Sequence, residues 1–228
     1  MASATVFLSV GAPACLVKVG NDEVLEALAQ IPDPNDPVTV RLRARPGTKQ
    51  ADLLQQKIAG DQLIVSGTLH LEESMPVITP GVICKGADEQ YFNEITLVGN
   101  LAKPGRQAEK SCSRSLGESR PIRNGDSWEE QTDWFIVRGY GSNDSSNSNS
   151  LRDRLNNAVK GSLVQIAGTL SQRKSKEGDT YVEVKARRIR VHKRGGGGGA
   201  PNPAEGKAVV GYDAEDFTGQ HDDMPDNW

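Results

Sequence analysis

The sequence has few of the features that place a chain in a membrane or cross-link it. It holds no run of about eighteen apolar residues, the length that a membrane-spanning helix needs. Residues 1–5 lack the charged segment and apolar core of a secretory signal, so we expect a cytoplasmic protein. The three cysteines, Cys15, Cys84 and Cys112, are scattered and odd in number. They offer neither a disulfide framework nor a metal cluster.

Patterns typical of catalysis are also missing. The histidines are isolated, and no carboxylates cluster at the spacing of metal ligands. The glycine run at 195–199 lacks the Lys and Ser/Thr that end a phosphate-binding loop. We therefore expect a protein that is not an enzyme and that needs no cofactor or metal.

Charge is unevenly distributed along the chain. Residues 93–194 hold 19 Lys and Arg against 12 Asp and Glu, a net charge of +7. Residues 195–228 hold one Lys against seven acids, and residues 1–92 hold seven basic and eleven acidic residues, net charges of −6 and −4. A basic middle between acidic flanks indicates a polyanionic ligand for the middle region.

The region 93–194 consists mostly of expected strands. The segment 134–140 is rich in aromatic and β-branched residues and is predicted as a central strand. The other expected elements are a strand at 95–99, a polar insertion at 141–150, a helix at 151–160 and a hairpin of strands 163–170 and 180–191 with its loop at 175–179. Strands, one short helix and a final hairpin are typical of an oligonucleotide-binding Greek-key barrel.

The first part of the chain repeats this order. Residues 38–43 match the central strand and residues 51–58 match the helix. Gly60 and the triplet at 67–69 recur as Gly161 and the triplet at 168–170, both at an offset of 101. The alternative is coincidence between two unrelated β segments.

We predict an all-β fold with small helical content: two tandem barrels and a disordered acidic tail. The expected boundaries are 1–90, 91–194 and 195–228, the last segment beginning with a Gly- and Pro-rich linker.

Alternate residues of a strand share a face, which sorts the central strand into two sets. Phe135, Val137 and Gly139 suit a barrel interior. The opposite set consists of Trp134, Ile136, Arg138 and Tyr140. Aromatic rings interleaved with an arginine suit base stacking beside a phosphate contact. The alternative is that Trp134 and Tyr140 belong to the core.

Further candidate contacts flank this strand. Trp128 lies in a polar run that we predict as a loop, where it would form a second stacking platform despite its acidic neighbours. The basic candidates on loops and strand edges are Arg120, Arg123, Arg173, Lys174 and Arg187, with Arg114 close by. Cations of this kind would line a groove that follows a phosphate backbone.

The chain ends in an acidic segment with a proline and a terminal aromatic residue. Such a segment cannot bury enough apolar surface to fold alone and suits a partner with an apolar pocket rimmed by Lys or Arg. The candidate partner-binding residues are Asp222, Asp223, Met224, Pro225, Asp226 and Trp228. The alternative is a solubilising tail without a partner.

Four stretches resemble the bacterial single-stranded DNA-binding proteins: 93–101, 129–134, 160–164 and 168–170. In that family a first strand ends in Gly-x-Leu, Thr-Glu/Asp-Trp opens the central strand and Lys-Gly-Ser precedes the fourth. The resemblance implies that Trp134 and Tyr140 stack bases. It also implies that residues 222–228 recruit replication and repair proteins in the bacterial nucleoid.

The chain departs from the family pattern at several positions. Ser175 stands near where many members carry another tryptophan, and the tip ends in Trp228 instead of Phe. The first barrel has Phe7 but no Trp or Tyr before Tyr91, so an assembly role is expected for it. The alternative is that Arg41, Arg43 and Arg45 let this barrel contact phosphates as well. Members usually form tetramers of single barrels, so we expect a homodimer of double barrels, with a homotetramer as the alternative.

The leading hypothesis is a protein that coats single-stranded DNA during replication, recombination and repair. The alternative keeps the barrel but makes it a primosome-type or RNA-binding accessory protein. Binding to poly(dT), to duplex DNA and to RNA separates these functions.

Overall fold

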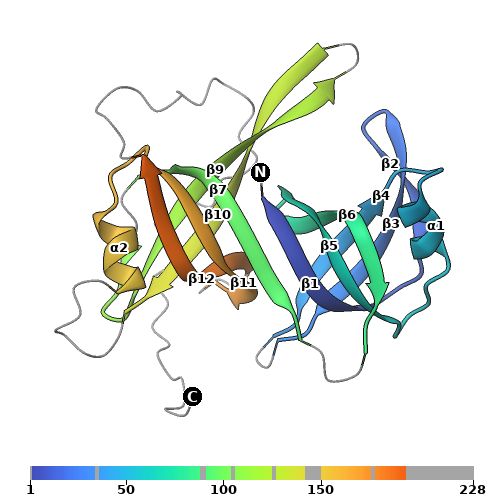
Figure 1. Ribbon diagram of the computed structural model, residues 1–228, viewed down its shortest axis with the longest axis horizontal. Helices are drawn as coiled ribbons and strands as arrows, with labels where there is room; N and C mark the ends of the chain where they lie inside the picture. The colour runs from blue at the N-terminus through green and yellow to red at the C-terminus, as the bar shows by residue number, and fades with distance from the viewer. Residues whose placement is uncertain are drawn as a thin grey trace.

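The computed structural model describes residues 2–33, 36–87, 91–103, 106–124, 127–141, 150–175 and 178–193. In these ranges the chain forms two β-barrels that lie side by side, each with one short helix (Figure 1). The expected linker and tail at 195–228 lie outside the described residues. Neither described helix is long and apolar enough to cross a membrane.

Barrel one precedes barrel two in the chain. Barrel one contains β1 (Ser3–Val10), β2 (Cys15–Val19), β3 (Asp22–Ile31), β4 (Val38–Ala44), α1 (Lys49–Gln55), β5 (Gln62–Glu72) and β6 (Met75–Lys85). Barrel two contains β7 (Asn93–Leu101), β8 (Arg106–Gln107), β9 (Ser111–Asn124), β10 (Ser127–Tyr140), α2 (Leu151–Asn157), β11 (Leu163–Lys174) and β12 (Thr180–Lys193).

Both barrels close in the same way. Strand β4 pairs in parallel with β6 in barrel one, and β10 pairs in parallel with β12 in barrel two. The other strand pairs of each barrel are antiparallel. In both cases a helix connects the central strand to the final hairpin. This repeated topology confirms the two-barrel fold predicted from the sequence.

The glycines at offset 101 have a structural reason. Gly67 and Gly168 each sit at a register shift in the final hairpin of their barrel. A Cβ atom at position 67 would lie 2.2 Å from the carbonyl oxygen of Thr79, and one at position 168 would lie 2.1 Å from that of Lys185. Only glycine fits such a close backbone approach, which is typical of a β-bulge.

The two helices are shorter than predicted. Thr48 and Ser150 cap α1 and α2, and their side chains accept hydrogen bonds from backbone N–H groups of the first turn. In barrel two Ala158 is already extended, so the helix stops before the predicted end at residue 160. Gly161 lies beyond it with a φ of +79°, and Gly60 after α1 has a φ of +93°.

The prediction of a loop around Trp128 is wrong. Residues 111–124 and 127–140 form one long antiparallel hairpin whose register pairs Trp128 with Arg123 and Trp134 with Gly117. The outer half of this hairpin projects from the barrel (Figure 1). Cross-strand backbone hydrogen bonds hold these polar residues extended, although their composition is typical of loops. The Asn-Gly pair at 124–125 is a hairpin-turn signal that the prediction overlooked.

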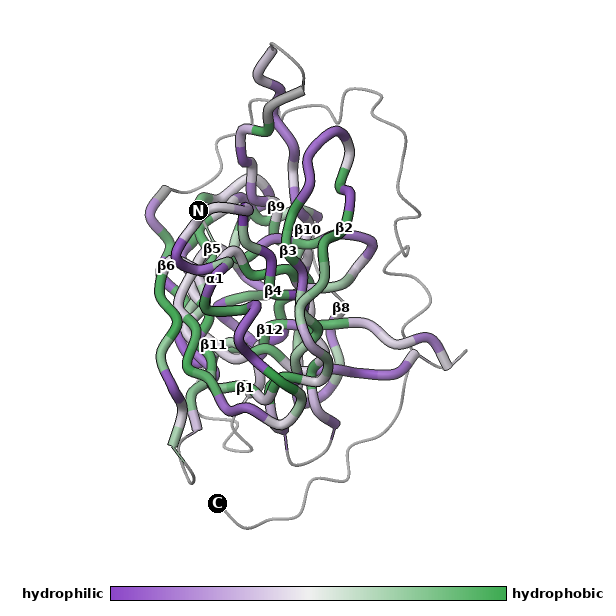
Figure 2. Tube along the Cα trace, turned by 90° about the vertical axis from the view of Figure 1, so that its right-hand side faces the viewer, coloured by the Kyte–Doolittle hydropathy of each residue, from purple (hydrophilic) through white to green (hydrophobic). Residues whose placement is uncertain are grey.

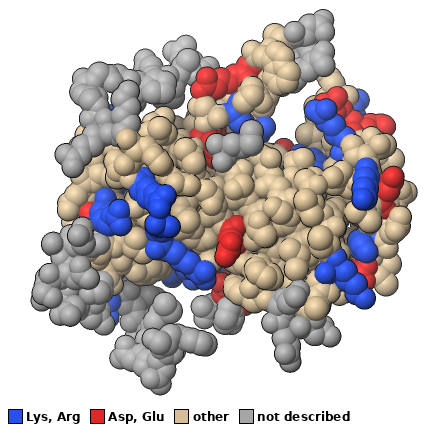
Figure 3. Space-filling model, viewed as in Figure 1, with Lys and Arg blue, Asp and Glu red and all other residues tan. Residues whose placement is uncertain are grey.

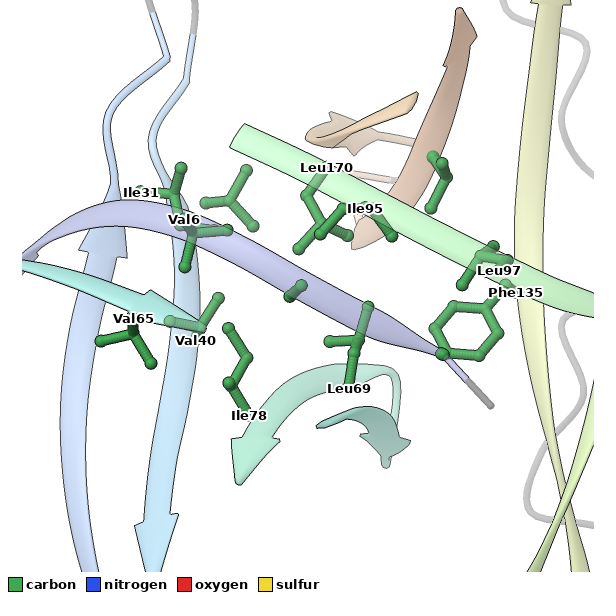
Figure 4. Packing of buried hydrophobic residues seen from close by; sticks show 14 of the residues in the cluster. Val6, Ile31, Val40, Val65, Leu69, Ile78, Ile95, Leu97, Phe135 and Leu170 are labelled. Atoms are coloured by element: carbon green, nitrogen blue, oxygen red, sulfur yellow. The ribbon is translucent and has the colours of Figure 1, made fainter. Parts of the chain in front are cut away.

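One apolar core runs through both barrels. Strands β1 and β7 pair antiparallel, which joins the barrels into a single twelve-stranded sheet. Figure 4 shows Val6 and Val65 of barrel one in the same buried cluster as Leu97 and Phe135 of barrel two. In Figure 2 the hydropathy alternates along the strands, and hydrophilic segments mark the projecting β2–β3 and β9–β10 hairpins.

Candidate nucleic-acid interface

The central strand β10 presents its two faces as predicted. Phe135 and Val137 are 2% and 0% exposed, and Gly139 is buried against the backbone of Leu151 at the start of α2. On the opposite face the Trp134 side chain is 53% exposed. Trp134 is therefore not a core residue, and its ring is exposed enough for a base to stack on it.

The Trp134 indole lies over the backbone of its cross-strand neighbour. Gly117 of β9 pairs with Trp134, and a Cβ atom at position 117 would lie 2.9 Å from Cζ3 and 3.0 Å from Cη2 of the indole. The missing side chain lets the ring rest on the sheet. The outer face of the ring is thus left free for a planar ligand.

Small residues continue the floor next to Trp134. The next three outward residues of β10 each face a serine of β9 across the ladder: Ile136 faces Ser115, Arg138 faces Ser113 and Tyr140 faces Ser111. These short side chains leave the larger β10 side chains standing above their neighbours. The alternation Ser-x-Ser-x-Ser-x-Gly at 111–117 has a period of two, a strand signal that lies outside the strands predicted from the sequence.

Arg138, Tyr140 and Arg173 meet around one buried carboxylate. The Glu183 side chain is 0% exposed and accepts from Arg138 Nε at 2.7 Å and from Arg173 Nε at 3.0 Å. Arg173 also donates to the Tyr140 hydroxyl. This group, which we call the cationic triad (Arg138, Arg173 and Glu183), holds two arginines and one glutamate, a formal charge of +1.

The Glu183 carboxylate stabilises the charged form of both arginines of the triad, and their pKa values are raised as a result. Burial alone would lower the pKa of Arg138, but the Glu183 carboxylate raises it above the ordinary value. The Glu183 carboxylate raises the pKa of Arg173 in the same way. Burial and the Glu183 charge raise the pKa of the Tyr140 hydroxyl. Both arginines therefore stay charged while a carboxylate fixes their positions, which suits contact with phosphate.

Trp128 and Arg120 lie together on the projecting hairpin. Trp128 is 71% exposed. The two residues line a shallow depression of about 270 Å³ with Ser119, Pro121, Glu129 and Glu130. Arg120 donates to Asp133 at 2.8 Å, so a carboxylate already matches its charge. This part of the surface offers a ring but no net positive charge.

The remaining basic candidates are spread over barrel two. Lys174 is exposed and follows Arg173 at the end of β11. Arg187 lines a second depression, of about 190 Å³, whose other residues come from β7 and β11, so it does not join Trp134. The Arg123 side chain lies outside the described residues, as does the tip at 222–228.

The placement of Arg114 among the groove cations is wrong. Arg114 is 2% exposed, and burial lowers the pKa of its guanidinium. It donates to the backbone carbonyls of Ala102, Lys103, Leu155 and Ala158. Arg114 therefore links β9 to the end of α2 and is not available to a ligand.

Positive charge gathers on one side of barrel two. Figure 3 shows a band of Lys and Arg over β12, whose exposed cations are Arg187, Arg188 and Arg190. The parallel pair of Arg138 with Lys185 places this strand next to the triad. Among the described residues no group of three or more His, Cys, Asp or Glu is placed to hold a metal ion.

Comparison with known proteins establishes the fold. No protein-family model and no curated protein matches the chain. The solved structure of the wild-type single-stranded DNA-binding protein from Thermus aquaticus matches over 88% of this chain and 97% of its own, with a TM-score of 0.58 and 15% identity. This chain has the two-barrel fold of that protein.

Two further solved structures were compared with the chain. A deletion mutant of the Thermus aquaticus protein matches with a TM-score of 0.56, 15% identity and the same coverage of both chains. The Plasmodium falciparum single-stranded DNA-binding protein, solved with single-stranded DNA, covers 46% of this chain and 96% of its own, with 20% identity and a TM-score of 0.37. The resemblance predicted from the sequence is confirmed at the level of the fold.

Proposed function

We propose that this chain binds single-stranded DNA without sequence preference through the β9–β10 face of barrel two. The observation that carries the proposal is Trp134, half exposed and packed against Gly117. Bases stack on such a ring whatever their identity, because every base has a π-face. The cationic triad, whose Arg138 lies on the same face of β10, supplies fixed guanidinium groups for the phosphates. The Thermus aquaticus protein with the same fold is named for this activity.

In the cell the protein would coat exposed strands during replication, recombination and repair in the cytoplasm. It would act by binding alone, without catalysis or a cofactor. An RNA-binding accessory role is the alternative function.

Trp134→Ala tests the proposal. Poly(dT) affinity should fall by roughly 1–3 kcal/mol, the contribution of one stacked base. Anisotropy of a labelled dT oligomer measures the affinity directly. Tyr91→Ala is the matched control, because Tyr91 is also about half exposed, at 48%, but lies outside the β9–β10 face.

Three results would count against the proposal. Unchanged affinity in Trp134→Ala would remove the ring from the site. Equal or tighter binding of duplex DNA would exclude a single-strand binder. A clear preference for poly(rU) over poly(dT) would favour the RNA-binding alternative.

We also propose that the acidic tip recruits replication and repair proteins, with Trp228 entering an apolar pocket. Deleting residues 222–228 should leave poly(dT) affinity intact or raise it, because the tip no longer competes for the cationic face. The same deletion should abolish the capture of partner proteins by the immobilised chain. Retained capture would place recruitment elsewhere.

The proposed assembly is a homodimer, which would bring together four barrels. The outward residues of β1, β5, β7 and β11 form a broad face, here called the central face. Away from Glu72 and Arg173 near the ends of β5 and β11, it includes Ser3, Thr5, Ser66, Thr68, Thr96, Val98, Gln165, Ala167 and Thr169, together with the charged Glu94. The centre of the view in Figure 3 is almost free of charge. Depletion of charge is typical of an interface core, and a second copy can pair with the same face through a two-fold axis.

A further inference from the structure

The two barrels can be matched position by position. Gly67 of β5 and Gly168 of β11 occupy the same bulge, as their close backbone approaches require. Five residues farther along each strand lie Glu72 in barrel one and Arg173 in barrel two. The same position therefore carries opposite charge in the two barrels.

The parallel pairs β4–β6 and β10–β12 also match the central strand of barrel one with that of barrel two. Leu42 of β4 and Val137 of β10 correspond, because their parallel partners on β6 and β12 lie at the same distance from the bulge. Both are 0% exposed. The next residues, Arg43 and Arg138, therefore occupy equivalent outward positions.

In barrel one these positions form a closed ion-pair network. Arg43 donates to Glu26 at 2.7 Å and to Glu72 at 2.5 Å, and its side chain is only 10% exposed. Arg41 lies 3.8 Å from Glu26 and 3.9 Å from Glu72. Two arginines and two glutamates give a formal charge of zero. Each guanidinium already has carboxylate partners.

In barrel two the equivalent positions carry net positive charge. One carboxylate, Glu183, lies between Arg138 and Arg173, and the group has a formal charge of +1. Glu183 can neutralise only one of the two guanidinium charges. A phosphate brought to this face therefore meets one positive charge that no carboxylate balances. A phosphate brought to barrel one has to displace a carboxylate from Arg43 or Arg41.

The stacking platform is missing from barrel one too. Thr39 stands at the position of Trp134, three residues before the matched pair of buried residues. Its cross-strand partner is the exposed Gln30, whereas the partner of Trp134 is Gly117. Phe7 is the one Phe, Trp or Tyr in residues 1–90, and it is 6% exposed.

From these differences we infer that each chain offers a single face to single-stranded DNA, and that barrel one excludes the strand. The inference rests on the proposed function. Barrel one keeps the fold but holds a neutral ion-pair network and no exposed ring where barrel two holds a cationic triad and an indole. A bound strand contacts barrel two alone, and one chain covers about half the nucleotides that two equivalent barrels would cover.

Matched charge removal tests the inference through the salt dependence of binding. Arg173→Gln/Lys174→Gln removes two cations from barrel two, and Arg41→Gln/Arg45→Gln removes two from barrel one. A labelled dT oligomer reports binding to either barrel, whereas tryptophan fluorescence does not, since Trp128, Trp134 and Trp228 all lie outside barrel one.

The barrel two variant should lose about 1.4 from the slope of log affinity against log salt, at about 0.7 per phosphate contact. The barrel one variant should keep the wild-type slope. An equal loss in both variants would overturn the inference and leave the proposed function standing. If the wild-type chain did not bind dT oligomers at all, the proposed function and the inference would both fail.

Thr39→Trp/Glu72→Arg provides a complementary test, because it gives barrel one the residues of barrel two at two matched positions. The number of nucleotides bound per chain at saturation, measured by sedimentation with poly(dT), should rise. If the folded variant bound the same number of nucleotides as the wild type, Thr39 and Glu72 would not be the residues that keep the strand off barrel one.

Discussion

Trp134 remains half exposed in a chain that has few aromatic residues for two barrel interiors. Burying a large apolar side chain contributes roughly 25 cal/mol for each Å² removed from water. Its neighbours Phe135 and Val137 make that contribution in full. The indole of Trp134 does not, so a ligand that covers it would gain the free energy of burying its exposed surface.

Gly117→Ala tests how the indole is positioned. The added methyl group would lie 2.9 Å from the ring, so the ring must lift from the sheet. The emission maximum of the protein should shift, and poly(dT) affinity should fall by up to about 1–3 kcal/mol, the value of one stacked base.

Gly141→Ala is the control for this substitution. A methyl group there meets the flexible side chain of Arg152 at 3.3 Å, outside the face of Trp134. The control should leave emission and affinity unchanged. Wild-type affinity in a folded Gly117→Ala protein would show that the placement of the ring against Gly117 does not matter for binding.

At the scale of elements, Arg114 fastens α2 to β9. Its guanidinium satisfies the last carbonyls of the helix and those of the segment after β7. Arg114→Leu should lower the free energy of unfolding by roughly 3 kcal/mol, since buried carbonyls lose charge-assisted hydrogen bonds. Urea denaturation followed by circular dichroism measures this change.

The exposed Arg190 provides the comparison on β12. Arg190→Leu should stay within about 0.5 kcal/mol of the wild type, as surface substitutions usually do. Equal stability of the Arg114→Leu and Arg190→Leu proteins would mean that the buried guanidinium is dispensable for the fold.

The ion-pair network of barrel one makes its stability depend on pH. The hydrogen bond with His70 and the charge of Arg43 hold the pKa of Glu72 at about 2, below its ordinary 4.5. A lowered pKa in the folded state stabilises the fold fully above pH 4.5, and that stabilisation is lost as pH falls towards 2. Unfolding free energies measured between pH 7 and pH 2.5 should therefore fall less steeply for Glu72→Gln than for the wild type.

Glu73→Gln is the control for this pH dependence, because Glu73 is the exposed neighbour of Glu72. Its profile should follow that of the wild type. A Glu72→Gln profile parallel to the wild type would remove this carboxylate from the acid response.

The projecting β9–β10 hairpin shows where prediction from sequence ends at this scale. The apolar alternation at 134–140 identified the inner half of β10, because one of its faces is buried. The outer half has no buried face, so Trp128 and its acidic neighbours carry no periodic apolar signal. Pairing with β9 holds that half extended, and pairing partners cannot be derived from one strand alone.

At the scale of the whole molecule, the β1–β7 pair joins the barrels and exposes the central face. Thr96 lies on this face and pairs with Ser3 of β1. Thr96→Arg should break the proposed homodimer, because a two-fold axis brings the new charge into the interface twice. Sedimentation equilibrium should give the mass of a monomer for the variant and that of a dimer for the wild type.

Lys18→Glu changes charge on the exposed strand β2 and is the control, since β2 stands at the far end of barrel one in the strand order, away from β1 and β7. It should keep the wild-type mass. A wild-type chain that sediments as a monomer would contradict the homodimer, and a mass of four chains would favour the homotetramer.

The sequence by itself determined the features that depend on local periodicity. The alternation of β10 separated Trp134 from Phe135, and the repeated glycines at offset 101 identified two barrels, because a bulge needs glycine at the same position each time. Only the tertiary structure decided which charges meet. The carboxylate partners of Arg43, Arg120 and Arg138 lie 13 to 45 residues away along the chain, and Arg114 is buried through contacts with α2. Such pairs depend on the register between distant strands, which no single segment of sequence contains.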